Sequence, residues 1–194
     1  MKISIVAFDN FTDIDLWLMW DLLNRVKDQG WEIKILGMKD SHVSNTGITI
    51  NMHGPLSETA TSDVVLFVSG PGTQKVILDQ NFLSALRLDP EHQMIGSMCT
   101  GALILAALKI LRPGDRATTY PTAKKQLESF GIEVIEQAIV KNRNVATAAG
   151  CLAAQDLAGW VMQRWAGEKI SHLVLNSIKP VGQGLYYSKS GVTK

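Results

Sequence analysis

The segment Gln93-Met94-Ile95-Gly96-Ser97-Met98-Cys99-Thr100-Gly101-Ala102-Leu103-Ile104-Leu105-Ala106-Ala107-Leu108 combines a strand, a sharp turn and a helix. Its first six residues predict a short buried strand, and the residues after Cys99 are strong helix formers. Cys99 therefore lies at a strand-to-helix junction among small residues, the pattern of a nucleophile elbow with cysteine in place of serine. The start of the helix favours a thiolate and so predicts a lowered pKa for Cys99. A buried cysteine that only fills space explains the same segment equally well.

The alternation of strands and helices continues on both sides of this segment. Strands separated by helices imply a mainly parallel sheet that is covered on both faces. The predicted fold class is α/β, a flavodoxin-like three-layer α/β/α sandwich with a mainly parallel central sheet. It is expected to form one domain over residues 1–180, followed by a loose tail over 181–194. The pattern predicts further strands at 3–8, 31–36, 64–68, 116–118, 132–134, 138–140 and 144–147, a hairpin at 43–51, and helices at 14–26, 74–87, 122–130, 151–165 and 168–178.

Composition excludes several classes of protein. The 194 residues include 19 Lys and Arg and 18 Asp and Glu, a net charge of +1, and no run of five like charges occurs. This charge pattern argues against a nucleic-acid surface. The longest mainly apolar run is far shorter than the roughly 20 residues that a membrane span needs. The N-terminal strand leads directly into Asp9 without the features of a signal peptide, so a cytoplasmic location is expected. Two cysteines are too few for a disulfide scaffold, and Cys151, which opens an apolar helix, is expected to serve in packing.

Asp15 lies in one of the predicted loops that leave the carboxyl ends of the strands, where open α/β sheets bind ligands. Thr12-x-x-Asp15 matches a capping box, and the local sequence favours this structural role. A carboxyl group that faces Cys99 would instead donate or accept a proton, with its pKa raised by a neighbouring thiolate.

Two further loops, residues 69–73 and 98–101, are expected at the same edge of the sheet. The backbone N–H groups of Gly72 and Thr100 are candidates for a two-donor site that binds developing negative charge. The Gly72 loop lacks the lysine of a phosphate-binding loop, and a plain strand-to-helix turn explains it as well. The four histidines show no metal-ligand spacing, so no metal and no other cofactor is expected.

Five motifs occur in one order along residues 1–180. They are Phe11-Thr12-x-x-Asp15, Gly70-Pro71-Gly72-Thr73, Gly96-x-x-Cys99-Thr100-Gly101-Ala102, Arg116-Ala117-Thr118-Thr119-Tyr120-Pro121 and Ala148-Ala149-Gly150-x-x-Ala153-Ala154-x-Asp156-Leu157. Together they resemble the ThiJ/PfpI superfamily, whose fold is like that of class I glutamine amidotransferases. The resemblance implies a flavodoxin-like domain, usually a homodimer, with Cys99 as the reactive cysteine. It also implies that Asp15 is the acidic residue beside that cysteine rather than a cap.

Within the superfamily, the cysteine followed by threonine is most similar to the isonitrile hydratase-like branch and to the ligand domains of AraC-type regulators. Tyr120 stands where other branches more often carry histidine. The resemblance implies a cysteine-dependent hydro-lyase that converts an isonitrile to an N-substituted formamide. Cys99 would attack, Asp15 would move protons, and Gly72, Thr100 and Tyr120 would position a small-molecule substrate.

Two alternatives stay open at this point. One is a glyoxalase-like activity, or another hydrolase or amidase activity of the superfamily, that uses the same thiol. The other is a non-catalytic sensor in which Cys99 is oxidised or binds a metabolite. No DNA-binding module is recognisable, and neither nucleic acid nor membrane is an expected partner.

Overall fold

The computed structural model describes residues 1–26 and 29–187, and its centre is a seven-stranded sheet. The strand order is β10-β11-β7-β6-β1-β2-β5. Every neighbouring pair is parallel except β10 and β11, so the prediction of a mainly parallel sheet is confirmed. The strands are β1 (Lys2–Val6), β2 (Glu32–Gly37), β5 (Gly54–Pro55), β6 (Val64–Phe67), β7 (Met94–Met98), β10 (Ile139–Asn142) and β11 (Val145–Ala148).

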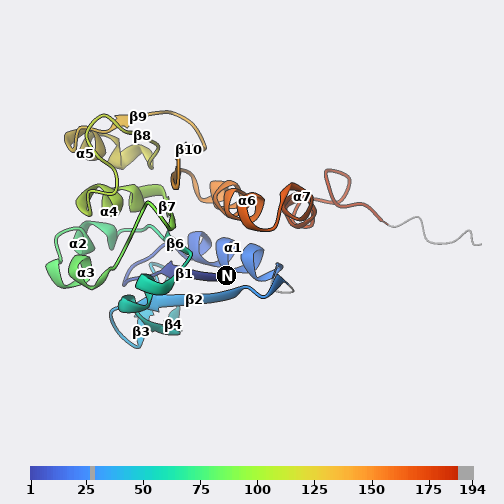
Figure 1. Cartoon of the computed structure of the whole chain (residues 1–194), viewed down its shortest axis with the longest axis horizontal. Coiled ribbons are helices and arrows are strands. Elements are labelled where there is room, and N and C mark those ends of the chain that lie inside the picture. Colours follow the sequence, from blue (N-terminus) through green and yellow to red (C-terminus); the bar gives the residue numbers. More distant parts are fainter. Residues whose placement is uncertain (27–28, 188–194) are drawn as a thin grey trace, which may run out of the picture.

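Helices cover both faces of this sheet, which confirms the three-layer sandwich (Figure 1). On one side α1 (Asp13–Asn24) packs against α6 (Ala154–Trp165), which in turn packs against α7 (Glu168–Asn176). On the other side α4 (Ala102–Ala107) contacts both α2 (Thr73–Val76) and α5 (Lys124–Ser129), and α3 (Gln80–Ala85) packs against α2. None of the helices in residues 1–26 and 29–187 is long and apolar enough to cross a membrane.

The core lies where the central strands are covered on both faces. All residues of β6 and β7 are buried, which explains why these segments read as continuous apolar runs rather than alternating ones. Phe8 and Phe82 meet edge to face, with ring centroids 6.0 Å apart, and join the end of β1 to α3. Parallel pairing of β1 with β6 and of β6 with β7 aligns the carboxyl ends of these strands, from which the loops of the site depart.

The helix predicted over residues 74–87 is wrong as one element. The structure has two short helices instead, α2 and α3, interrupted at residues 77–79. The break has a local cause, because the Asp79 side chain accepts hydrogen bonds from the N–H groups of Asn81 and Phe82 and so starts a new helix. The sequence pattern also does not predict the 3₁₀ helices η2 (Leu56–Thr61), η3 (Cys99–Gly101), η4 (Pro121–Ala123) and η5 (Cys151–Ala153).

The predicted hairpin is confirmed as β3 (Ser41–Val43) and β4 (Thr49–Asn51). The strands expected near 116–118 and 132–134 do not join the central sheet; β8 (Arg116–Ala117) and β9 (Glu133–Val134) pair with each other. Of the tail predicted over 181–194, residues 188–194 lie outside the described part of the chain.

Candidate functional site

Cys99 occupies a strained turn between β7 and η3. Its φ of +44° lies in the left-handed region that side chains rarely adopt, as expected for a nucleophile elbow. The Thr119 hydroxyl donates a 2.9 Å hydrogen bond to the Cys99 carbonyl and holds the turn. Contrary to the usual picture of an exposed nucleophile, only 3% of Cys99 is exposed. The elbow therefore presents its sulfur to an enclosed space rather than to open solvent.

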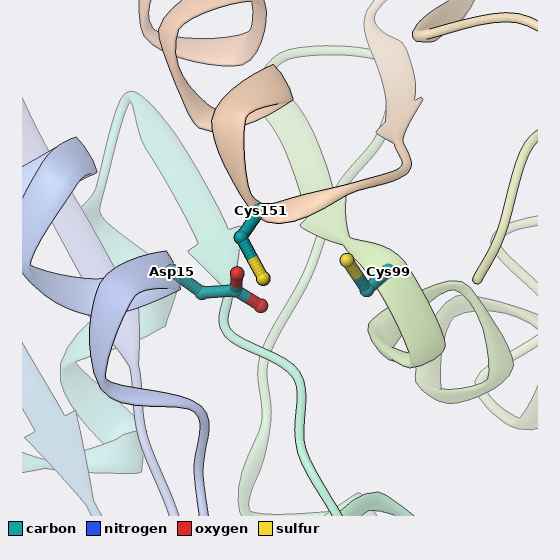
Figure 2. A group of neighbouring side chains, drawn as sticks. All are labelled: Asp15, Cys99 and Cys151. Carbon is teal, nitrogen blue, oxygen red and sulfur yellow. The ribbon is translucent and has the colours of Figure 1, made fainter.

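Three reactive side chains meet at this point: Asp15, Cys99 and Cys151 (Figure 2). One ligand atom from each lies within 4.8 Å of the others. Asp15 comes from the first turn of α1, whereas the cysteines follow β7 and β11, two adjacent parallel strands. The structure thus brings together Cys99 and Asp15, the pair expected from the sequence. It adds Cys151, for which the sequence indicated only a packing role.

Asp15 is fully buried and is held by one neighbour, Ser69. The Ser69 hydroxyl donates a 2.5 Å hydrogen bond to Oδ2 of Asp15, whereas Oδ1 has no hydrogen-bond partner among the described residues. Burial raises the pKa of Asp15, and the Ser69 and Cys151 side chains partly oppose this effect. The Thr12 side chain makes no capping hydrogen bond to α1. The capping-box interpretation is therefore wrong, and the Asp15 carboxyl group lies in the cluster instead.

Both thiols are harder to ionise than a free cysteine. Burial, followed by the charge of Asp15 and the proximity of Cys151, raises the pKa of Cys99 to about 12. The Gly150 N–H and the Ser69 hydroxyl oppose this shift only in part. Burial and the same carboxylate raise the pKa of Cys151 to about 11. The lowered pKa predicted from the helix start is wrong, because desolvation and a neighbouring negative charge outweigh the helix.

Thr100 and Gly72 hold loops together in this structure. The Thr100 hydroxyl lies 2.9 Å from that of Thr73 and accepts a 3.3 Å hydrogen bond from the Gly70 N–H. The Gly72 N–H donates to the Asn10 carbonyl at 3.2 Å, so it is occupied and not free for a substrate. A Cβ at Gly72 would overlap the Asp9 carbonyl oxygen, and this close approach explains the glycine.

Tyr120 lines a cavity of about 590 Å³ beside the elbow. The cavity shares Thr119 and Gly150 with the surroundings of Cys99, since Thr119 bonds the Cys99 carbonyl and the Gly150 N–H acts on its thiol. These two residues connect the cavity wall to the cluster. The complete lining is Thr118, Thr119, Tyr120, Pro121, Lys124, Val134, Ile135, Glu136, Gln137, Ala138, Ala149 and Gly150.

The cluster is also the arrangement of residues that best matches a metal site. Within residues 1–26 and 29–187, Asp15, Cys99 and Cys151 form the one group of three potential ligands close enough to contact a single ion. A metal would require both thiols to lose their protons, which their raised pKa values oppose. The sequence shows no sign of this group. None of its members is a histidine, and the three residues are far apart in the sequence.

Comparisons with known proteins agree with the geometry. Residues 1–164 match the model of the DJ-1/PfpI family. The chain is 26% identical to the isonitrile hydratase of Pseudomonas putida over 178 residues, covering 90% of this chain and 76% of that protein. It is 24% identical to a deglycase of Pyrococcus abyssi over 167 residues, covering 84% of this chain and 96% of that protein.

Solved structures show the same fold. A ThiJ/PfpI family protein from Pseudomonas syringae superposes with a TM-score of 0.82 at 22% identity, covering 93% of this chain and 76% of that one. DJ-1 of Schizosaccharomyces pombe superposes with a TM-score of 0.79 at 16% identity, covering 93% and 100% of the two chains.

Proposed function

Because the chain belongs to the DJ-1/PfpI family, we propose that it is a cysteine-dependent enzyme in which Asp15 exchanges a proton with Cys99. One observation carries this proposal. Asp15 is fully buried, yet its Oδ1 has no hydrogen-bond partner within residues 1–26 and 29–187, and its carboxyl group lies in the cluster with the Cys99 thiol. A buried carboxylate oxygen without a hydrogen bond is unfavourable for folding. Such an oxygen is, however, available to accept a proton during catalysis.

The first chemical step is nucleophilic attack on a small uncharged substrate. The reaction that we assign, on the model of the Pseudomonas putida relative, is hydration of an isonitrile to an N-substituted formamide. The Cys99 sulfur forms a bond to the terminal carbon while Asp15 accepts the thiol proton. Asp15 then delivers this proton to the same carbon, and a thioimidate remains attached to Cys99.

The second step is hydrolysis of this adduct. Asp15 takes a proton from the attacking water and returns it to the nitrogen, so a tetrahedral carbon carries hydroxyl, sulfur and nitrogen. The carbon–sulfur bond then breaks, the hydroxyl proton returns to the sulfur, and the formamide leaves. Cys99 and Asp15 regain their starting protonation states.

The substrate enters through the cavity beside the elbow. Its wall includes Tyr120, whose ring is 45% exposed, together with apolar side chains such as Val134 and Ile135. We assign Tyr120 to substrate binding and the Thr100 N–H to the stabilisation of developing charge. Gly72 contributes by holding its loop against Asp9 rather than by donating to the substrate.

A second candidate is a deglycase or glyoxalase-like reaction on a small carbonyl compound. The deglycase of Pyrococcus abyssi, at nearly the same identity as the hydratase, supports it. The same thiol would attack a carbonyl carbon. None of the four histidines belongs to the cluster or lines the cavity in the described part of the chain, so Asp15 would again have to move the protons.

The discriminating experiment incubates purified protein with alkyl isonitriles and, separately, with methylglyoxal. Product is followed by proton NMR, and Cys99→Ala is measured in parallel. Formamide from the wild type and none above background from Cys99→Ala is the expected result. Lactate without formamide would replace the first candidate by the second. No product from either substrate would reject both and favour a sensor.

A homodimer is part of the proposal. Exposed apolar side chains gather next to the cluster: Ile14 and Trp17 on α1 are 43% and 38% exposed, and Leu152, next to Cys151, is 67% exposed. Because η5 packs against α1, these side chains belong to one surface, which a second copy would cover. The cytoplasmic location and the single domain over residues 1–180 stay predictions.

A further inference from the structure

We propose that Cys151 is a resolving cysteine, which forms an intrachain disulfide with Cys99 after a hydroperoxide has oxidised Cys99. The disulfide would keep Cys99 from irreversible oxidation. This inference does not rest on the proposed hydratase reaction. It requires only the two thiols of the cluster and the Asp15 carboxylate, which exchanges protons with them.

The two sulfur atoms are already close and face each other (Figure 2). They lie within 4.8 Å, and a disulfide bond of about 2.05 Å requires an approach of less than about 3 Å. The parallel strands β7 and β11 hold the two segments side by side, with Met98 opposite Ala148. Cys99 follows Met98 directly, and Cys151 follows Ala148 after two residues. The sheet therefore sets the distance between the thiols.

The turn before Cys151 is not packed against other residues at Gly150. Gly150 precedes Cys151 with a φ of +85°, and nothing lies within 4 Å of the position that its Cβ would occupy. Cys151 itself is half-buried, whereas Cys99 is held in its turn by the Thr119 hydrogen bond. Movement of Cys151 toward a fixed Cys99 is thus the easier change.

Oxidation would proceed in two balanced steps. The Cys99 sulfur attacks one oxygen of the hydroperoxide and the O–O bond breaks, which gives a sulfenic acid and an alcohol or water. Asp15 carries the thiol proton to the leaving oxygen. The Cys151 sulfur then attacks the Cys99 sulfur, the S–O bond breaks, and water leaves with the Cys151 proton. Two thiols supply the two electrons that reduce one peroxide.

Asp15 is placed to serve both steps. It is the carboxylate of the cluster, with an oxygen within 4.8 Å of both sulfur atoms. None of the described residues forms a hydrogen bond with its Oδ1, which can therefore accept a proton. The thiols are neutral at rest, so each reacts only as Asp15 takes its proton. Without Cys151, further peroxide would convert the sulfenic acid to sulfinic acid.

The test is the intact mass of the reduced protein after treatment with one to a few equivalents of hydrogen peroxide, measured without reductant. The wild type is expected to lose about 2 Da, to regain this mass with dithiothreitol, and to yield a peptide that links residues 99 and 151. Cys151→Ser is expected to gain about 32 Da at Cys99 instead, as sulfinic acid. Cys99→Ser is the matched control and should form no intrachain link.

The proposal is overturned if the wild type gains oxygen at Cys99 as fast as Cys151→Ser and yields no linked peptide. A disulfide between two chains, seen as a doubled mass, also overturns it. If a variant does not fold, the presence or absence of the peptide that links residues 99 and 151 in the wild type still tests the proposal. Turnover of isonitriles by the reduced wild type, measured separately, shows whether the proposed function has failed on its own.

Discussion

The protonation state of the site depends on two residues, Asp15 and Cys99. Burial raises the pKa values of both, and the Asp15 charge adds to the shift of Cys99. A preformed thiolate beside an ionised Asp15 is therefore unfavourable. The arrangement favours a neutral thiol that reacts as the carboxylate takes its proton, which supports the proposed role of Asp15 as a general base.

The pH dependence of turnover follows from this arrangement. A carboxylate that accepts a proton must be ionised, and the folded-state pKa of Asp15 is raised above its ordinary 3.8. The value of kcat/KM is therefore expected to fall as the pH decreases through this raised pKa, with a midpoint above 3.8. Initial rates across the pH range in which the protein stays folded, checked by circular dichroism, measure the midpoint. A profile that stays flat down to 3.8 would exclude Asp15 as the base.

The rate at which Cys99 is alkylated also depends on the negative charge of Asp15. Removal of this charge should increase the alkylation rate, although it should decrease turnover. Asp15→Asn removes a negative charge that raises the pKa of Cys99. The variant is therefore expected to react several-fold faster with iodoacetamide at about pH 9, where more thiolate would be present. Mass spectrometry of the peptide that contains Cys99 gives the rate. Asp13→Asn, on the same turn of α1, should leave the rate near that of the wild type, and an equal or slower rate in Asp15→Asn would contradict the electrostatic account.

At the level of elements, the alternation of strands and helices was predictable from the sequence, because the central strands are buried on both faces and give uninterrupted apolar runs. The elbow was predictable for the same reason, since Cys99 directly follows the apolar run of β7. The break between α2 and α3 was harder to foresee, because apolar spacing continues across residues 77–79 while Asp79 caps a new helix. The 3₁₀ turns at Cys99 and Cys151 depend on packing between loops, which periodicity does not report.

The loop that contains Gly72 offers a test of this packing. Gly72→Ala would place a methyl group against the Asp9 carbonyl oxygen, and overpacking of this kind costs roughly 1–3 kcal/mol. Gly54→Ala is the matched control, because the nearest atoms to its added Cβ belong to the carboxyl group of Glu58, at the end of a flexible side chain, rather than to the backbone. Urea unfolding should show the larger loss of stability for Gly72→Ala. Equal stabilities would contradict a packing role for Gly72.

At the level of the whole molecule, three segments far apart in the sequence meet at one edge of the sheet (Figures 1 and 2). The rule that placed Cys99 at the end of a strand applies equally to Cys151, which follows β11 after two residues. The sequence contains this signal, but the apolar helix that follows Cys151 favours a packing role. The raised pKa of Asp15 is expected from a position facing Cys99, but its cause is burial rather than a neighbouring thiolate. The raised pKa values of the two cysteines were not predictable, since they arise from burial and from neighbours that only the folded chain provides.

The proposed homodimer can be tested by a charged substitution on its expected interface. Trp17→Asp places a charge on the exposed apolar surface formed by Ile14, Trp17 and Leu152, and we expect it to weaken self-association at least about tenfold, or about 1.4 kcal/mol. Leu173→Asp on α7, where the leucine is 71% exposed, is the matched control and should leave association unchanged. Light scattering over a dilution series gives the mass of each. Dissociation of the control alone would place the interface on α7 instead.

The most direct test of the central claim is the rate of formamide production by Asp15→Asn. This variant keeps Cys99 and nearly the same shape, but it removes the one buried base beside the thiol. The account predicts that kcat/KM for an alkyl isonitrile falls by about 10²-fold or more, although Cys99 in the same sample alkylates faster than in the wild type, while Asp13→Asn stays within a few-fold of the wild type. An Asp15→Asn enzyme that hydrates isonitriles at the wild-type rate would contradict the account.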